Sequence, residues 1–148
     1  MPTKTESLAS VIDETRRLFH RLANAAERLQ ADLDVTASER AVLEALARGS
    51  HTVPEIARSK GVSRQHIQTI VNSLASDDLV EARENPAHQR SSLLALTPAG
   101  ERCFREIQKR EQVVLGELAQ RFRGSDLEKV AQTLKALGDH LEAAVARR

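Results

Sequence analysis

Apolar residues recur every three or four positions over most of this chain, the spacing of one face of an α-helix. In the stretch GVSRQHIQTIVNSL, for example, Ile67, Ile70, Val71 and Leu74 share one face while polar side chains occupy the rest. Helices are predicted from this spacing over residues 8–33, 37–48, 53–60, 64–76, 98–122 and 126–148. The polar residues before the first helix are expected to be frayed.

Helix boundaries carry capping signals. The spacing S/T-x-x-E lets a hydroxyl and a carboxylate satisfy backbone N–H groups at a helix start reciprocally. It precedes three of the predicted helices, as Thr36 with Glu39, Thr52 with Glu55, and Ser125 with Glu128. The remaining signals are Gly61 as the stop of the third helix, Ser63 as the N-cap of the fourth, and Thr97 with Pro98 at the start of the fifth.

The helical spacing is lost between residues 79 and 97. LVEAREN begins with strand-like composition, PAHQRS is polar and starts with proline, and SLLALT is an apolar run too short for a helix. We expect a β-hairpin with a basic tip near Arg90. The predicted fold is mainly α with a small β-hairpin wing.

Composition narrows the class of protein. A chain of 148 residues fits one domain, and aromatic residues at 2% argue against a binder that stacks single-stranded bases. The formal net charge of +1 demands neither a nucleic acid nor a membrane. With one cysteine, Cys103, no intrachain disulfide can form, and the N-terminus lacks the apolar run of a signal peptide. These features predict a cytoplasmic protein without a membrane partner.

The third and fourth helices have the spacing of a helix-turn-helix. Ala57 allows close approach, Gly61 permits a left-handed turn, and Ile67 and Ile70 attach the second helix to the first. A hairpin directly after this motif makes it a winged version, whose tip can reach the groove beside the one that the helix occupies.

The polar face of the fourth helix is a candidate DNA-reading surface. From residue 58 to 72 the chain carries three cations and no acidic residue. The start of the second helix of such a motif lies in the major groove, where arginine pairs with guanine and glutamine with adenine. The candidates for major-groove contact are Ser63, Arg64, Gln65, His66, Gln68 and Thr69, and those for phosphate contact are Arg58 and Lys60. The alternative is a solvated helix face that binds nothing.

From about residue 8 to its end, the chain resembles the MarR-type winged-helix transcriptional regulators. The resemblance rests on residues 54–100, PEIARSKGVSRQHIQTIVNSLASDDLVEARENPAHQRSSLLALTPAG, which includes the L-T-x-x-G element formed by Leu96, Thr97 and Gly100. It implies that Arg90 is the wing arginine and enters the minor groove, whose negative potential attracts arginine. A solvated loop arginine is the alternative.

Two positions depart from the pattern of that family. His88 stands where the family usually has the aspartate that orients the wing arginine, so that support is absent here. Asp78 replaces the usual glycine after the fourth helix, although aspartate tolerates left-handed backbone better than most residues.

The resemblance further implies a homodimer and a small-molecule effector. The predicted partition is a single MarR-like domain over residues 1–148, with dimerisation helices at 8–33 and 101–148 and a winged helix-turn-helix DNA-binding lobe at 36–98. A monomer with self-packed terminal helices is the alternative.

Enzyme chemistry is not expected. The sequence holds no phosphate loop, H-E-x-x-H or C-x-x-C motif, its five histidines are scattered over different predicted elements, and we predict no catalytic residues, metal site or cofactor. Cys103 is a structural, partly buried cysteine or, alternatively, a thiol activated near a helix end.

We therefore expect a dimeric repressor that binds a palindromic operator in double-stranded DNA and is released by a small molecule. The rival hypothesis is a winged-helix protein-interaction module that does not bind DNA.

Overall fold

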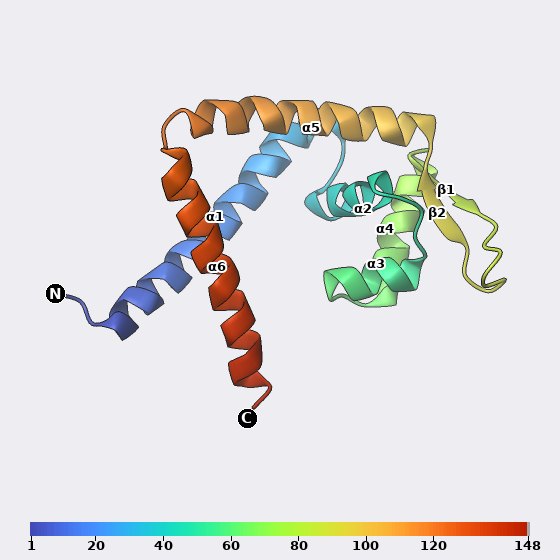
Figure 1. Cartoon of the computed structure of the whole chain (residues 1–148). Helices are drawn as coiled ribbons and strands as arrows, with labels where there is room; N and C mark the ends of the chain where they lie inside the picture. The colour runs from blue at the N-terminus through green and yellow to red at the C-terminus, as the bar shows by residue number, and fades with distance from the viewer. Residues whose placement is uncertain (148) are drawn as a thin grey trace. The chain divides into compact units, whose positions relative to one another are not determined.

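The computed structural model describes residues 1–147 (Figure 1). As predicted, it is mainly helical with one two-stranded antiparallel sheet. Its elements in chain order are α1 (Lys4–Gln30), the short 3-10 helix η1 (Ala31–Leu33), α2 (Ala37–Ala47), α3 (Val53–Lys60), α4 (Arg64–Ser76), β1 (Val80–Arg83), β2 (Leu93–Leu96), α5 (Pro98–Ala119) and α6 (Gly124–Val145).

The predicted caps of α2, α3 and α4 are confirmed. The Thr36 hydroxyl accepts a hydrogen bond from the Glu39 N–H at 3.2 Å, and the Glu39 carboxylate accepts from the Thr36 N–H at 2.9 Å. Thr52 and Glu55 form the same reciprocal pair at the start of α3. These boxes satisfy N–H groups that a helix leaves free at its start, so the boundaries follow from local sequence.

Two helix starts differ from the prediction. α1 begins at Lys4, because Thr3 and Glu6 form a capping box that orders residues expected to be frayed. α6 begins at Gly124 with Arg123 as its N-cap residue, so the predicted box of Ser125 and Glu128 does not set its start. There the Arg123 guanidinium binds the Asp126 carboxylate at 3.0 Å.

The described chain divides into two compact units, residues 1–110 and 111–147. The apolar core lies in the first unit, where α2 packs against α4 and β2, and α3 packs against α4. Its most deeply buried apolar side chains are Val42, Leu43, Ile56, Leu74 and Ile107. Aliphatic side chains dominate this core, as the low aromatic content predicts.

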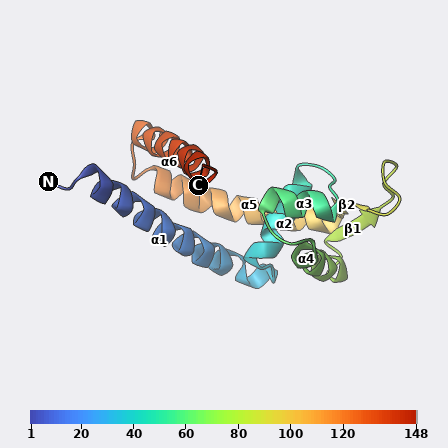
Figure 2. The same cartoon turned by 90° about the horizontal axis from the view of Figure 1, so that it is seen from below.

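The hairpin of β1 and β2, with its connecting loop, spans residues 80–96 and is called the wing below. Val80 pairs with Leu96 and Arg83 with Leu93, so four residue pairs form the ladder. An isolated bridge between His51 and Leu94 attaches β2 to the segment before α3. The tip of the wing extends away from α2, α3 and α4 in both views (Figures 1 and 2).

The base of the wing is fixed by Asp78 and Thr97. Asp78 adopts left-handed backbone at φ 58°, which agrees with the prediction that it occupies a position usually taken by glycine. The Thr97 hydroxyl donates to the Asp78 carbonyl and accepts from the Gly100 N–H, which caps α5. A Cβ on Gly100 would lie 1.9 Å from the Leu79 carbonyl oxygen, so this close approach requires glycine.

An ion pair joins η1 to α5 within the first unit. The Arg110 guanidinium donates to both carboxylate oxygens of Asp32, at 3.0 Å for the longer bond, and to the Leu29 carbonyl at 2.9 Å. The hydrogen bond from Arg110 lowers the pKa of the Asp32 carboxyl below its ordinary value.

The second unit holds the end of α5 and all of α6. Two large apolar side chains of α5, Leu115 and Leu118, are exposed in the single chain. Their apolar spacing is present, but no element of this unit covers them within the described residues. No helix among residues 1–147 is both long enough and apolar enough to cross a membrane.

Candidate nucleic-acid interface

A tight turn places the start of α4 at the surface. Gly61 ends α3 with φ 65°, where its missing Cβ avoids a steric penalty, and the Val62 N–H donates to the Ala57 carbonyl at 3.1 Å. The Ser63 hydroxyl then accepts from the His66 N–H at 3.1 Å, as predicted for an N-cap. The turn therefore fixes the direction in which α4 leaves α3.

The two faces of α4 differ as the sequence predicts. Ile67, Ile70, Val71 and Leu74 are buried against the core. The polar side chains between them are exposed, so α4 presents a rigid polar face held from behind by its apolar face.

A polar contact also anchors α4. The Ser73 hydroxyl donates to the Glu39 carboxylate of α2 at 2.7 Å, and the carboxylate also accepts from the backbone and hydroxyl of Thr36. Burial of Glu39 acts to raise the pKa of its carboxyl, but the hydrogen bonds from Thr36 and Ser73 outweigh it and lower the pKa. Glu39 is thus a buried, fully bonded carboxylate that fixes the position of α4 on α2.

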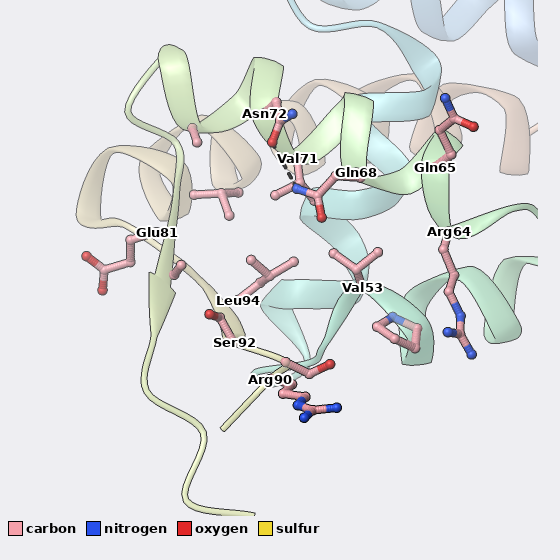
Figure 3. Close-up of a pocket in the computed structure, with 15 residues that line it drawn as sticks. Val53, Arg64, Gln65, Gln68, Val71, Asn72, Glu81, Arg90, Ser92 and Leu94 are labelled. Carbon is pink, nitrogen blue, oxygen red and sulfur yellow. Dashed lines mark hydrogen bonds between the residues drawn. The ribbon is translucent and has the colours of Figure 1, made fainter. Parts of the chain in front are cut away.

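A cavity of about 540 Å³ opens between α4, the wing and the start of α3, and we call it the α4–wing groove (Figure 3). Arg64, Gln65, Gln68 and Asn72 line it from α4, and Arg90 lines it from the wing. The structure therefore brings together side chains that are up to 26 positions apart in sequence. Guanidinium and amide groups dominate its polar lining, a set that suits base edges and phosphates.

The remaining sequence-predicted candidates are exposed but do not line the groove. Ser63, His66 and Thr69 lie on other parts of the α4 surface, and Arg58 and Lys60 lie on α3. The Thr69 hydroxyl donates to the Gln65 carbonyl at 3.0 Å, which leaves its oxygen able to accept a hydrogen bond.

Asn72 lines the groove and was not among the residues predicted from sequence. The Gln68 Nε2 donates to the Asn72 Oδ1 at 2.9 Å, shown as a dashed line in Figure 3. The i, i+4 spacing of the two amides is the signal that could have identified it, because such residues are neighbours on a helix.

Asn85 is a second residue that sequence analysis missed. Its side-chain amide donates to the Ser91 carbonyl at 2.9 Å, and its side-chain oxygen accepts from the Ala87 N–H at 3.1 Å. The His88 backbone contributes two turn hydrogen bonds in the same loop, to Asn85 and from Ser91. Asn85 thus closes the loop that carries Arg90, in a chain where His88 replaces the usual aspartate.

One acidic side chain lines the groove. Glu81 of β1 accepts from the Arg83 guanidinium, with an Nε to Oε1 distance of 2.8 Å. The Arg83 guanidinium offsets the charge of Glu81, so Arg64 and Arg90 give the groove a net positive charge.

The comparisons with known proteins bear on the family. Residues 33–91 match the sequence model of the MarR family. Over 98% of this chain and 96% of the other, the fold matches the crystal structure of the MarR family transcription regulator SP03579, with a TM-score of 0.89 and 29% sequence identity. The chain belongs to the MarR family.

The chain also matches a curated protein in sequence and further solved structures in fold. The chain is 30% identical over 133 residues to an uncharacterized protein of Mycobacterium tuberculosis, covering 90% of this chain and 93% of the relative. A crystal structure of a MarR cysteine mutant from E. coli complexed with operator DNA matches with a TM-score of 0.70 at 23% identity, over 85% of this chain and 94% of that chain. The regulator BldR from Sulfolobus solfataricus matches with a TM-score of 0.77 at 15% identity, over 96% of this chain and 99% of that chain.

In this MarR-family chain, Cys103 is partly buried on α5, and burial raises the pKa of its thiol. A raised pKa reduces the fraction of reactive thiolate, which favours the structural role over the activated one. Among residues 1–147, no three histidine, cysteine, aspartate or glutamate side chains are grouped so that they could hold a metal ion.

Proposed function

We propose that this MarR-family chain is a dimeric, sequence-specific repressor that binds a palindromic operator in double-stranded DNA. The observation that carries the proposal is the α4–wing groove, which gathers Arg64, the Gln65 and Gln68 amides and Arg90 on one exposed surface. Residues 58–72, which include the part of α4 that lines this groove, contain three cations and no acidic residue. This positive charge is complementary to the negative phosphates of DNA.

In the proposed complex, α4 lies in the major groove and the wing tip lies over the adjacent minor groove. Arg64 pairs with guanine, and Gln65 and Gln68 face adenine edges. Ser63, as the N-cap of α4, and His66 and Thr69 on α4 are further candidates for contact in the major groove. Arg58 and Lys60 contact phosphates and set the register of the protein on the duplex. Arg90 enters the minor groove, where the narrow channel concentrates negative potential.

Dimerisation through the terminal helices completes the proposed site. Large apolar side chains of α1, α5, α6 and the turn between α5 and α6 are exposed in the single chain, among them Leu18, Leu118, Phe122 and Leu141. Soluble monomers rarely expose so many large apolar groups on long helices, so a second copy of the chain is the proposed cover. A two-fold dimer would present two α4 helices to half-sites about one helical turn, ~34 Å, apart.

We further propose that a small molecule releases the repressor. Such an effector must bind more tightly to a state in which the two DNA-binding lobes do not match the spacing of the half-sites. The differential affinity for the two states then sets the degree of release.

The test is selection of bound duplexes from a random double-stranded DNA pool by the purified full chain, followed by sequencing. The proposal predicts enrichment of a palindrome whose half-sites lie about one helical turn apart. No enrichment and no retention of DNA at low salt would contradict it and would favour the rival, a protein-interaction module. Binding by that module would depend little on salt, since it would rest on apolar contacts.

A further inference from the structure

Two amide side chains on the exposed face of α4 are bonded to one another. The Gln68 Nε2 donates to the Asn72 Oδ1 at 2.9 Å, and both side chains line the α4–wing groove. Both residues are exposed, and each follows Arg64 at a spacing of four or eight positions. The three side chains therefore form one row along the surface that faces the groove.

We propose that Asn72 is a positioning residue that fixes the Gln68 amide in the orientation that reads adenine in the major groove. This inference rests on the proposed function and deepens it, because it assigns a base to one side chain and gives a role to a residue outside the predicted set.

The bond determines which edge of the Gln68 amide stays open. The Gln68 oxygen points away from Asn72 in Figure 3, so the Nε2 hydrogen used in the bond is the one opposite the oxygen. The open edge then carries Oε1 as an acceptor and the second Nε2 hydrogen as a donor. Adenine presents the complementary pair in the major groove, its N6 amino group as donor and N7 as acceptor.

The same edge discriminates against the other purine. Guanine presents two acceptors in the major groove, O6 and N7, so the Gln68 oxygen would face another acceptor. Rotation of the amide by half a turn would exchange donor and acceptor. In that orientation the Gln68 oxygen would face the Asn72 oxygen, so the bond would persist only if the Asn72 amide turned by half a turn as well. Asn72 therefore couples the orientation of the Gln68 amide to its own, and an acceptor-only side chain at position 72 would allow only the observed one.

Gln65 is the natural contrast on the same helix. Within residues 1–147 its side-chain amide has no hydrogen-bond partner, although it lines the same groove. On binding DNA, the Gln65 side chain must lose more rotamer freedom than the pre-oriented Gln68 side chain. Gln68 is therefore the stronger candidate for discriminating adenine from the other bases.

The experiment uses the duplex selected by the wild-type protein, with each adenine replaced in turn by 7-deazaadenine. This base keeps the N6 amino group and Watson–Crick pairing but lacks the N7 acceptor. The discrimination ratio is the affinity for the unmodified duplex divided by that for the modified one. We expect at least one adenine in each half-site with a ratio within the range of about 5- to 150-fold that bidentate base contacts give.

Four variants separate reading from folding. Gln68→Ala should bring the ratio at that adenine to about one, and Asn72→Leu should lower it several-fold by freeing the amide. Asn72→Asp keeps an acceptor for the Gln68 Nε2, so it should preserve the ratio while weakening binding to all duplexes through its negative charge. Ser76→Ala, an exposed change at the end of α4 outside the α4–wing groove, is the control and should leave the ratio at this adenine unchanged. Thermal unfolding of each variant shows that it is folded.

Each outcome has a definite meaning. If Asn72→Leu lowers the melting temperature but keeps the wild-type ratio, the amide pair only stabilises the helix, and the positioning role is wrong. If Gln68→Ala keeps the ratio, Gln68 is not the reader. If the wild-type protein selects no duplex at all, the proposed function itself fails, and this inference fails with it.

Discussion

The Ser73 hydroxyl of α4 lies 2.7 Å from the carboxylate of Glu39 on α2, two residues separated by 34 positions in sequence. The same carboxylate completes the capping box at the start of α2 and is only 8% exposed. One buried charge therefore joins the start of α2 to the helix that we propose reads DNA. Removal of such a carboxylate, or of one of its hydrogen-bond partners, destabilises a fold because the buried polar groups that remain are left without a partner.

Glu39→Ala should lower the free energy of unfolding by about 1–3 kcal/mol, because it removes the carboxylate of the capping box and the acceptor of the bond from the Ser73 hydroxyl. Urea denaturation followed by circular dichroism measures the change. Glu55→Ala is the matched control, since Glu55 forms the same kind of box at an exposed site. Its loss should be smaller, about 0.5–1 kcal/mol. Equal losses in the two variants would contradict the role of the bond between the helices.

The pH dependence of stability follows from the same carboxyl. The pKa of Glu39 lies below its ordinary value of 4.5, so the unfolded chain binds a proton more readily than the folded one. Its contribution is complete above pH 4.5 and is lost as the pH falls through the lowered pKa of the folded state. The free energy of unfolding, measured by urea titration between pH 6 and about pH 3, should fall toward the acid end.

The Glu39→Gln variant isolates this contribution, because its side chain does not ionise. We expect the stability of this variant to fall less steeply with decreasing pH than that of the wild-type protein. Parallel pH profiles would show that the acid sensitivity arises from other carboxyls, such as Asp32 in its pair with Arg110.

Removal of a cation that contacts bases should change DNA binding differently from removal of a cation that contacts phosphates. Arg64→Ala should cost roughly 1–3 kcal/mol and relax the preference at one base pair in each half-site. Lys60→Ala should weaken binding to every sequence by about the same factor, because phosphate contacts carry no sequence information. Fluorescence anisotropy with the selected duplex and single-base variants measures both effects. Equal loss on selected and random duplexes for Arg64→Ala would remove its role as a reader.

The oligomeric state should depend on the apolar faces of the terminal helices. Leu18→Glu in α1 or Phe122→Glu after α5 should shift the protein from dimer to monomer, because a charge buried in an apolar interface is costly. Sedimentation velocity at micromolar concentration measures the shift. Val62→Glu, at an exposed apolar site in the turn before α4, is the control and should leave the dimer intact. A dimer that survives both terminal substitutions would contradict the proposed interface.

Sequence signals that act over a few residues predicted most of the fold. The caps at Thr36, Thr52 and Ser63, the left-handed Gly61 and the alternating faces of α4 all rest on contacts within one or two helical turns. For the same reason the order of helices and the hairpin could be predicted before any packing was considered.

Local signals predicted the wrong start for two helices, α1 and α6. Thr3 and Glu6 have the capping spacing but precede the apolar stripe of α1, so the stripe alone placed the helix start too late. At α6, the spacing of Ser125 and Glu128 was present, but Arg123 and Asp126 have the same spacing two residues earlier and form the contact at the observed start.

The groove could be predicted only in part. Arg64, Gln65 and Gln68 follow from helix periodicity, and Arg90 follows from the family resemblance. The support of the wing by Asn85 depends on loop geometry, and the bond from Ser73 to Glu39 joins residues that only packing brings together. Such contacts have no sequence period, so one sequence does not indicate them.

The most direct test of the central claim compares wild-type binding to the selected duplex and to a scrambled duplex of equal length and composition, each at two salt concentrations. The account predicts tighter binding to the selected duplex, affinity that falls with salt at a log–log slope of about −0.9 per phosphate contact, and loss of the preference in an Arg64→Ala, Arg90→Ala double variant. Equal affinity for the two duplexes, or a preference that survives the double variant, would contradict the claim that the α4–wing groove reads DNA.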